Sequence, residues 1–241
     1  MKRALITGAA RRIGREIALE LAAAGLDILL HVRRFDADSE DLAGRIRAAG
    51  RRAFVMEADL ADAAGLVDAF DRAVATHGPV DMLVNNAAIF RHDRLDGFDP
   101  VVLRAHVAVN LEAPLLLARG LQATLPEDST GLIVNIIDER IAAPTGQFLS
   151  YDISKAGLWT ATRALARDLA PRIRVNAVAP GLVIPPGDGS DHGFDARVGS
   201  TPLGIRTDPR EIARAVRFIM ESPSMTGTRI LIDSGRHLRP R

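Results

Sequence analysis

Short apolar runs alternate with longer amphipathic stretches along almost the whole chain, and this alternation constrains the fold more than any other feature. The short runs are rich in β-branched residues or leucine and largely apolar at successive positions; they cover residues 4–7, 28–32, 53–57, 82–85, 132–137, 175–179 and 229–232. This pattern is typical of parallel strands covered on both faces. The segments between them follow a helical pattern, at residues 15–24, 39–49, 63–77, 101–125, 154–169 and 209–221.

Repeated β-α units require right-handed crossovers, which predicts an α/β fold: one doubly wound Rossmann domain with a parallel, roughly seven-stranded sheet over residues 1–241. A length of 241 residues with 47% hydrophobic and 25% charged residues fits one such domain. Gly25, Gly50 and Gly78 follow three predicted helices, where left-handed C-terminal residues are expected. Residues 182–205 interrupt the pattern, and loops of this length are typically functional, so we expect a substrate loop there.

Composition excludes several classes of protein. Lys and Arg number 31 against 30 Asp and Glu, and the basic residues are spread along the chain, so nucleic acid is not an expected partner. The absence of Cys excludes disulfides and thiol nucleophiles. No apolar run of ~18 residues or signal peptide is recognised, so we expect a cytoplasmic enzyme without a membrane partner. No metal is predicted, because the histidines lack ligand spacing and are interpreted as surface or core residues: His31, His77, His92, His106, His192 and His237.

The first predicted strand ends in a turn that suits a pyrophosphate. Gly8 permits a tight strand-to-helix turn, and Gly14 permits the following helix to pack closely on the sheet. The backbone N–H groups and positive dipole at the start of that helix favour an anion. A glycine pair alone would also fit an ordinary tight turn, but its position in the first β-α turn favours a dinucleotide site.

Tyr151 and Lys155 form the second motif. They are the only Tyr and the only interior Lys of the chain, since the other Lys is Lys2. Their i, i+4 spacing places both on one face of a helix. Asn110 lies in the middle of another predicted helix, where Asn is mildly unfavourable, which indicates a specific role.

In their order along the chain, these motifs resemble the short-chain dehydrogenase/reductase superfamily over essentially the whole sequence. The motifs are Thr7-Gly8-x-x-x-Arg12-Ile13-Gly14, Asn85-Asn86-Ala87, Tyr151-x-x-x-Lys155 and Pro180-Gly181. Most of the superfamily has Gly where this chain has Arg12. Arg at this position resembles the pteridine reductase branch, including bacterial dihydromonapterin and dihydrofolate reductases, where it lies near the cofactor phosphates and the substrate.

The resemblance implies a role for each matching residue. Lys155 would lower the phenol pKa and bind the nicotinamide ribose, Tyr151 would donate a proton as hydride arrives, and Asn110 would hold a proton-relay water. Asp59 would accept a hydrogen bond from the adenine amine, beside Leu60. Phe90 would stack on a pterin. The implied cofactor contacts are Gly8, Arg11, Arg12, Ile13, Gly14, Arg33, Arg34, Asp59, Leu60, Asn86, Ala87, Tyr151, Lys155, Pro180 and Gly181; a homotetramer is also implied.

The end of the second strand favours NADPH over NADH. NAD-specific members have an acid there for the ribose 2′-hydroxyl. Here the strand runs into Arg33 and Arg34, and the next acid is Asp36. Together with Arg11, these guanidinium groups are candidates to bind a 2′-phosphate, although any one of them could be an ordinary surface arginine.

Asp138 occupies the position where the superfamily usually has Ser, thirteen residues before Tyr151. An ionised carboxylate cannot donate to a developing alkoxide, but it can accept from a ring N–H or hold a proton beside Tyr151. The resembling pteridine reductases also carry Asp here. The pattern therefore predicts NADPH-dependent reduction of a C=N bond in a pterin or folate, with Asp138, Tyr151, Lys155 and Asn110 as the catalytic set and Arg12, Phe90, Asp138 and Tyr151 facing the substrate.

Two alternatives remain open at this stage. One is a short-chain reductase of ketones, which Asp138 disfavours. The other is a protein that binds NADPH without catalysis, which the presence of Asn110, Tyr151 and Lys155 disfavours.

Overall fold

The predicted strands form one parallel seven-stranded sheet in the order β3-β2-β1-β4-β5-β6-β7, in a computed structural model that describes residues 1–185 and 193–238. Their bounds are β1 Arg3–Thr7, β2 Asp27–Val32, β3 Ala53–Glu57, β4 Met82–Asn85, β5 Gly131–Ile136, β6 Ile173–Pro180 and β7 Arg229–Ile232. The predicted doubly wound α/β domain is confirmed. The strand order reverses between β1 and β4, and sheets of this kind bind ligands beyond the C-terminal strand ends at that point.

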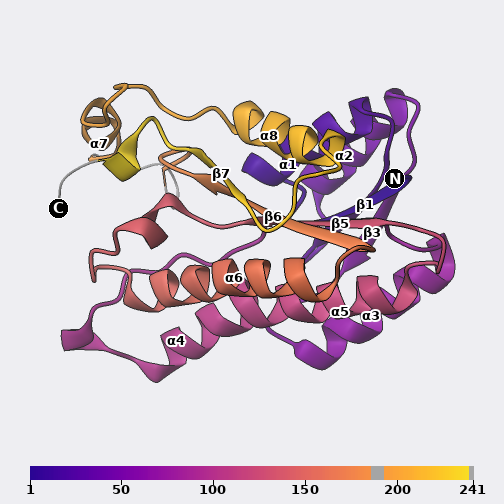
Figure 1. Ribbon diagram of the computed structural model, residues 1–241, viewed down its shortest axis with the longest axis horizontal. Helices are drawn as coiled ribbons and strands as arrows, with labels where there is room; N and C mark the ends of the chain where they lie inside the picture. The colour runs from indigo at the N-terminus through magenta and orange to yellow at the C-terminus, as the bar shows by residue number, and fades with distance from the viewer. Residues whose placement is uncertain (186–192, 239–241) are drawn as a thin grey trace.

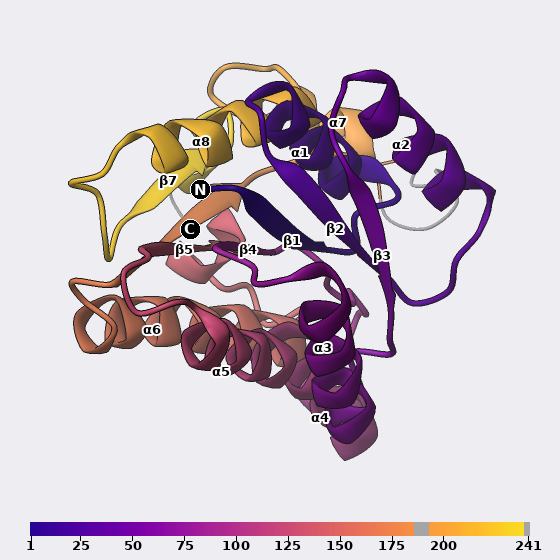
Figure 2. The same cartoon turned by 90° about the vertical axis from the view of Figure 1, so that its right-hand side faces the viewer.

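Helices cover both faces of the sheet (Figures 1 and 2). One layer contains α1 (Arg12–Ala23), α2 (Ala37–Ala48) and α8 (Pro209–Glu221); the opposite layer contains α3 (Ala63–His77), α4 (Pro100–Val107), α5 (Ala113–Thr124) and α6 (Leu149–Asp168). Alternate residues of each strand point into different layers, so two apolar cores form. Ile6 and Ile17 belong to the first core, and Leu5 and Leu66 to the second.

Helix boundaries differ from the predicted ones at two places near the strand ends. The long helix expected at 101–125 contains a π-helical turn, Ala108–Glu112, between α4 and α5. This turn is centred on Asn110, and such bulges are frequent at functional sites. Helix α6 begins at Leu149, before the predicted start, and therefore includes Tyr151 and Lys155. Gly25, Gly50 and Gly78 all adopt positive φ values, as predicted.

Four short elements were not expected from the sequence, because a single turn carries little periodicity. They are the 3₁₀ turns η1 (Leu95–Gly97), η3 (Glu139–Ala142) and η4 (Arg236–Leu238), and helix α7 (Phe194–Gly199). Helix α7 lies inside the segment 182–205 that we predicted to be a substrate loop. Residues 186–192 of that segment, including His192, lie outside the described residues, so its role stays a prediction.

The helical stretch Pro100–Thr124 is long and apolar enough to cross a membrane by length and composition, with a mean hydropathy of 1.5 over its best window. Only 33% of that window is buried in this chain. Core helices of soluble proteins meet the same criterion, and α5 packs against α3 and β4 here. The finding is weak evidence for a membrane, and the expected absence of a membrane partner stays a prediction.

Backbone conformation requires glycine at position 8, and close approach of the backbone requires it at position 14. Gly8 has φ +62°, in the left-handed region that glycine tolerates. A Cβ added to Gly14 would collide with the carbonyl oxygen of Gly8 and lie 2.7 Å from Asn86 Nδ2. The turn that precedes α1 therefore leaves no room for a side chain at position 14, as expected for the predicted close packing of this helix.

Replacing Gly14 by Ala is expected to lower the free energy of unfolding by about 1–3 kcal/mol, because the helix must move away from the turn. Gly44, in α2, is the matched control: an added Cβ there meets nothing within 4 Å. Gly44→Ala should raise the free energy of unfolding by about 0.5–1 kcal/mol through helix propensity. Urea denaturation measures both, and equal effects of the two substitutions would contradict the proposed close approach.

Candidate active site

The turn after β1 is held by the residues that follow β4, the neighbouring strand. The hydroxyl oxygen of Thr7 accepts hydrogen bonds from the backbone N–H groups of Asn86 and Ala87, at 2.9 and 3.0 Å. The side-chain amide of Asn86 donates to the carbonyl oxygen of Thr7 at 2.9 Å. The two motifs that the sequence placed near a cofactor thus meet at the point where the strand order reverses.

The first turn of α1 leaves its backbone donors available. Within the described ranges, Arg11 makes no side-chain cap hydrogen bond at this N-terminus, so an anion could accept from these N–H groups. Arg12 has φ +55°, a left-handed conformation that costs a non-glycine residue roughly 1–2 kcal/mol. Its guanidinium donates to the carbonyl oxygens of Ile184 and Pro185, at 3.2 and 3.1 Å. Arg12 therefore links this turn to the segment after β6.

The three arginines predicted to bind a 2′-phosphate differ in their partners. Arg11 pairs with Asp38 and, at 2.6 Å, with Asp36. Arg33 lies 3.1 Å from Asp59, the carboxylate expected to bind adenine. Arg34 is exposed and makes no ion pair or side-chain hydrogen bond within residues 1–185 and 193–238. Arg34 is thus the candidate whose guanidinium is available without breaking an ion pair.

His31 joins the two turns that face the predicted cofactor, a role that the sequence did not reveal. The backbone N–H of Gly8 donates to His31 Nδ1, and His31 Nε2 lies 3.2 Å from the carbonyl oxygen of Ala58. Since Nδ1 accepts, Nε2 carries the proton and donates to Ala58. Burial lowers the pKa of His31 to about 4, so the ring is neutral at pH 7. The interpretation of His31 as a core histidine is confirmed.

The remaining predicted cofactor residues lie around the same end of the sheet. Leu60 is buried in the turn after β3, next to Asp59, whose carboxylate accepts from the backbone N–H of Ala61 at 2.9 Å. Pro180 ends β6, and a Cβ added to Gly181 would lie 2.6 Å from the Cα of Asp233. Gly181 therefore brings the segment after β6 against the segment after β7.

The predicted catalytic residues Asp138, Tyr151 and Lys155 come together at the C-terminal end of β5. Helix α6 presents both Tyr151 and Lys155 from one face, as the i, i+4 spacing predicts. The phenol of Tyr151 donates to Asp138 Oδ2 at 2.8 Å. The ammonium of Lys155 donates to the carbonyl oxygen of Ile136 at 2.8 Å. Tyr151 and Lys155 are 6% and 3% exposed, so their interactions are poorly screened by solvent.

The pKa of the Tyr151 phenol differs from the expected direction. The superfamily resemblance implies that Lys155 lowers it, but burial and the neighbouring Asp138 carboxyl raise the pKa of Tyr151 well above its ordinary value. Burial also raises the pKa of Asp138, and it lowers the pKa of Lys155 to about 8. The lowered phenol pKa is thus corrected: Lys155 bonds to Ile136 rather than to the phenol, and a carboxyl is the phenol's direct partner.

Asn110 uses its amide to connect three segments. Its oxygen accepts from the backbone N–H of Ile89 at 2.9 Å, and its nitrogen donates to the carbonyl oxygen of Ile89 and to the hydroxyl of Ser154, both at 3.0 Å. Ser154 belongs to α6, between the two catalytic candidates. Asn110 therefore fixes the segment after β4 against helix α6, and its predicted water-holding role stays a prediction.

Phe90 lies beside Tyr151, as expected, but it has an aromatic partner that the sequence did not suggest. Its ring stacks on Phe148 with centroids 4.3 Å apart, and meets the edge of Tyr151 at 4.7 Å. The guanidinium of Arg140 lies 4.7 Å from the centroid of Phe148. Phe90 is 40% exposed, so an open aromatic surface adjoins the phenol. Phe148 lacks a motif of its own and could not be identified from sequence.

Asp93 caps the start of helix α6, although it lies 57 residues away from Ser150 in sequence. Both of its carboxylate oxygens are 3.1 Å from the backbone nitrogen of Ser150, and the Ser150 hydroxyl also bonds to this carboxylate. The backbone of Asp93 pairs with that of Phe148. This cap orients the first turn of α6, which carries Tyr151, and no local pattern could have predicted it.

Comparison with known proteins identifies the family. The model of the short chain dehydrogenase family matches residues 2–190. The chain belongs to the short chain dehydrogenase family. Among relatives of this family, the 3-oxoacyl-acyl-carrier-protein reductase FabG of Aggregatibacter actinomycetemcomitans is 33% identical over 236 residues, which cover 95% of both chains.

Two solved structures of the family are closely similar to this chain. The FolM alternative dihydrofolate reductase 1 of Brucella suis, in complex with NADP, is 40% identical with a TM-score of 0.94, over 100% of this chain and 96% of that one. The Brucella canis protein of the same name, also with NADP, is 43% identical with a TM-score of 0.90, over 99% and 95%. The expected superfamily is therefore confirmed.

The neutral His31 predicts a specific pH dependence of stability. Its folded pKa of about 4 lies below the ordinary 6.5, so this group contributes stability above pH 6.5 that is lost as the pH falls toward 4. His31→Gln removes the titration but keeps a donor and an acceptor. Between pH 7 and pH 5 the wild type should lose about 2 kcal/mol more than this variant in urea denaturation.

The exposed His92 provides the control for this comparison, because it does not bridge the two turns. His92→Gln should keep the pH dependence of the wild type. An identical loss of stability in the wild type and His31→Gln would show that His31 takes up a proton freely in the folded state, contrary to its buried position.

Proposed function

We propose that this protein catalyses the NADPH-dependent reduction of a C=N bond in a pteridine, converting a dihydropterin or dihydrofolate to its tetrahydro form. The hydrogen bond between Tyr151 and Asp138 carries the proposal. A ketone reductase needs a donor to the developing alkoxide at this position, whereas a carboxyl suits a ring nitrogen that must receive a proton.

The residues at the switch point fit NADPH. The turn leaves no room for side chains at positions 8 and 14. The N-terminus of α1 offers backbone donors to a pyrophosphate. Arg34 offers a guanidinium to a 2′-phosphate. The bound cofactor would supply the hydride. Two close structural neighbours are complexes with NADP, which supports this choice of cofactor.

In this proposal, Tyr151 and Asp138 supply the proton together. A pterin lies against Phe90, and the phenol protonates the ring nitrogen next to the carbon that receives the hydride. The raised pKa of Asp138 keeps its carboxyl protonated to a higher pH than an exposed aspartate, so it can return a proton to the phenol oxygen. Lys155 holds the end of β5 through the carbonyl oxygen of Ile136.

The similarity to two FolM alternative dihydrofolate reductases, at 43% and 40% identity, supports a pterin or folate substrate. The second candidate is a ketone reductase, which the 33% identity to a 3-oxoacyl-acyl-carrier-protein reductase favours. Asp138 separates the two candidates, because no Ser lies between Ser129 and Ser150 to replace it as a donor.

NADPH oxidation with a dihydropterin, dihydrofolate and a set of ketones tests the proposal. The wild type should reduce the pteridines, and Asp138→Ala should lower kcat by about 10²-fold or more. Asp138→Ser should also impair pterin reduction while permitting weak ketone reduction. NADPH binding, followed by fluorescence, should stay unchanged in both variants.

Two results would contradict the proposal. Efficient reduction of ketones without any reduction of dihydropterins would favour the ketone reductase. Tight NADPH binding without turnover of any of these substrates would favour a protein that binds NADPH without catalysis.

The preference for NADPH should depend most on Arg34. Arg34→Ala is expected to raise the Kd of NADPH by roughly 10-fold or more and to leave that of NADH unchanged. Arg11→Ala is the matched comparison and should have a smaller effect, because Asp36 and Asp38 already pair with Arg11. Titration of the wild type with both cofactors completes the test: equal affinities for NADH and NADPH would refute the assignment.

A further inference from the structure

The 3₁₀ turn η3 determines where the Asp138 carboxyl points. Asp138 is the residue that precedes this turn, and its Oδ1 accepts from the backbone N–H of Arg140 at 3.0 Å. Its Oδ2 accepts from Tyr151 at 2.8 Å. One oxygen is thus held by η3 and the other by α6, so a small displacement of η3 would break the alignment of the carboxyl with the phenol.

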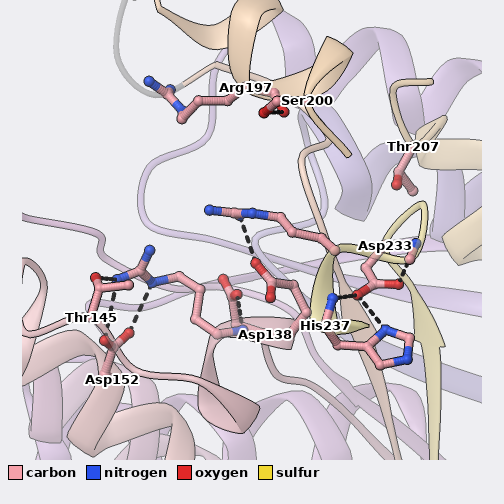
Figure 3. Close-up of polar contacts among 12 residues, drawn as sticks. Asp138, Thr145, Asp152, Arg197, Ser200, Thr207, Asp233 and His237 are labelled. Atoms are coloured by element: carbon pink, nitrogen blue, oxygen red, sulfur yellow. Dashed lines mark hydrogen bonds and ion pairs between the residues drawn. The ribbon is translucent and has the colours of Figure 1, made fainter. Parts of the chain in front are cut away.

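Two ion pairs hold η3 from opposite sides (Figure 3). On the α6 side, Arg140 makes hydrogen bonds of 3.0 and 3.2 Å to the two carboxylate oxygens of Asp152, and its guanidinium also donates to Thr145. On the other side, Glu139 pairs with Arg236 at 2.6 Å. The side chains of Glu139 and Arg236 are only 5% and 22% exposed, so this second pair is poorly screened by solvent.

Arg236 belongs to the C-terminal turn η4, which is itself fixed by Asp233. The Asp233 carboxylate accepts from the backbone N–H groups of Gly235 and His237, at 3.1 and 2.8 Å. It also lies 2.7 Å from His237 Nδ1. Figure 3 shows this cluster beside the turn that carries Asp138. Gly181 packs against the backbone of Asp233, which ties η4 to the end of β6.

We propose that the Glu139–Arg236 ion pair positions the Asp138 carboxyl, so that the C-terminal turn from Asp233 to Leu238 is a working part of the catalytic centre. This inference rests on the proposed function of Asp138. Glu139 and Arg236 are positioning residues: they act through the neighbouring turn and the local charge. The geometry that carries the inference is the direct sequence adjacency of Glu139 to Asp138 and the buried contact of Glu139 with Arg236.

The Glu139–Arg236 ion pair also affects the pKa of Asp138 through its charges. Burial, together with the like charges of Asp138 and Asp233, raises the pKa of Glu139 to about 7, although Arg236 acts in the opposite direction. Such coupling between neighbouring carboxyls is mutual. The other charged or titratable groups that face Asp138 and Glu139 come from η3, α6, η4 and the residue after β7; they are Arg140, Tyr151, Asp152, Lys155, Arg236 and Asp233.

Substituting Glu139 or Arg236 should therefore change the proton affinity of Asp138 in opposite directions. Glu139→Gln removes a negative charge next to Asp138 and should lower its apparent pKa. Arg236→Met removes a positive charge and should raise it. A purely structural defect would not produce shifts of opposite sign, which separates a positioning role from a general loss of stability.

The experiment follows the Asp138 carboxyl directly by ¹³C NMR in protein labelled at aspartate, with the signal assigned through Asp138→Asn. The variants are Glu139→Gln, Arg236→Met, the conservative Arg236→Lys and the double variant Glu139→Gln/Arg236→Met. Arg217→Met is the matched control, because Arg217 forms ion pairs with Glu20 and Glu221 away from η3. Steady-state kinetics with NADPH and a dihydropterin, measured across pH, complete the set.

We expect the Asp138 pKa to fall by about half a pH unit or more in Glu139→Gln and to rise by a similar amount in Arg236→Met. The alkaline limb of kcat/KM should move in the same directions, and kcat should fall by about 10-fold while the KM for NADPH stays within twofold. Arg236→Lys should restore most of kcat. The double variant keeps the test valid if either single variant is too unstable, and it should show an intermediate pKa with a reduced kcat.

Unchanged Asp138 titration and kinetics in the Glu139 and Arg236 variants would overturn the inference, as would shifts of the same sign in both single variants. Failure of the proposed function is distinguishable, because it would be seen as a wild type that does not reduce dihydropterins. The NMR titration would still decide whether the ion pair acts on Asp138.

Discussion

The hydrogen bond between the Tyr151 phenol and the Asp138 carboxyl depends on three separate parts of the chain. Helix α6 supplies the phenol, the end of β5 supplies the carboxyl, and η3 fixes the second oxygen of that carboxyl. Burial raises the pKa of both groups; the carboxyl raises the pKa of the phenol further, whereas the hydrogen bond from the phenol lowers the pKa of the carboxyl. A buried pair of this kind holds a proton at neutral pH, and the proposed chemistry requires that proton next to a C=N bond.

The surrounding structure can be understood as support for this pair. Asp93 caps the first turn of α6, and Asn110 ties the same helix to the segment after β4. Lys155, also on α6, donates a hydrogen bond to the backbone carbonyl at the end of β5. On the cofactor side, His31 connects the turn of Gly8 to the turn after β3. The contacts of Asp93 and Lys155 use charged groups, but these residues are only 6% and 3% exposed, so salt screens them weakly.

Local patterns were sufficient to predict the sheet, most helices and the residues with characteristic spacing. Parallel strands buried on both faces leave a strong apolar signal, and the i, i+4 spacing of Tyr151 and Lys155 follows from helix geometry alone. Contacts between distant segments could not be predicted in this way. The cap of Asp93 on α6, the stacking of Phe148 on Phe90 and the pairing of Glu139 with Arg236 all depend on tertiary structure.

The arginines illustrate a further limit of sequence reasoning. Arg11, Arg33 and Arg34 are equivalent in sequence as candidates for a phosphate, but nearby carboxylates engage Arg11 and Arg33. The superfamily resemblance also gave the wrong direction for the pKa of Tyr151, because that pKa depends on which group the phenol contacts. Charge, unlike apolar periodicity, acquires its meaning from neighbours that the chain brings together only on folding.

The pH dependence of dihydropterin reduction tests the shared proton most directly. If Tyr151 and Asp138 act together, kcat/KM of the wild type falls at alkaline pH, as the Asp138 carboxyl loses its proton. In Asp138→Asn, which keeps the size of the side chain but cannot titrate, this alkaline limb should disappear and the remaining rate should be low. An alkaline limb of the same position in the wild type and in Asp138→Asn would contradict the account.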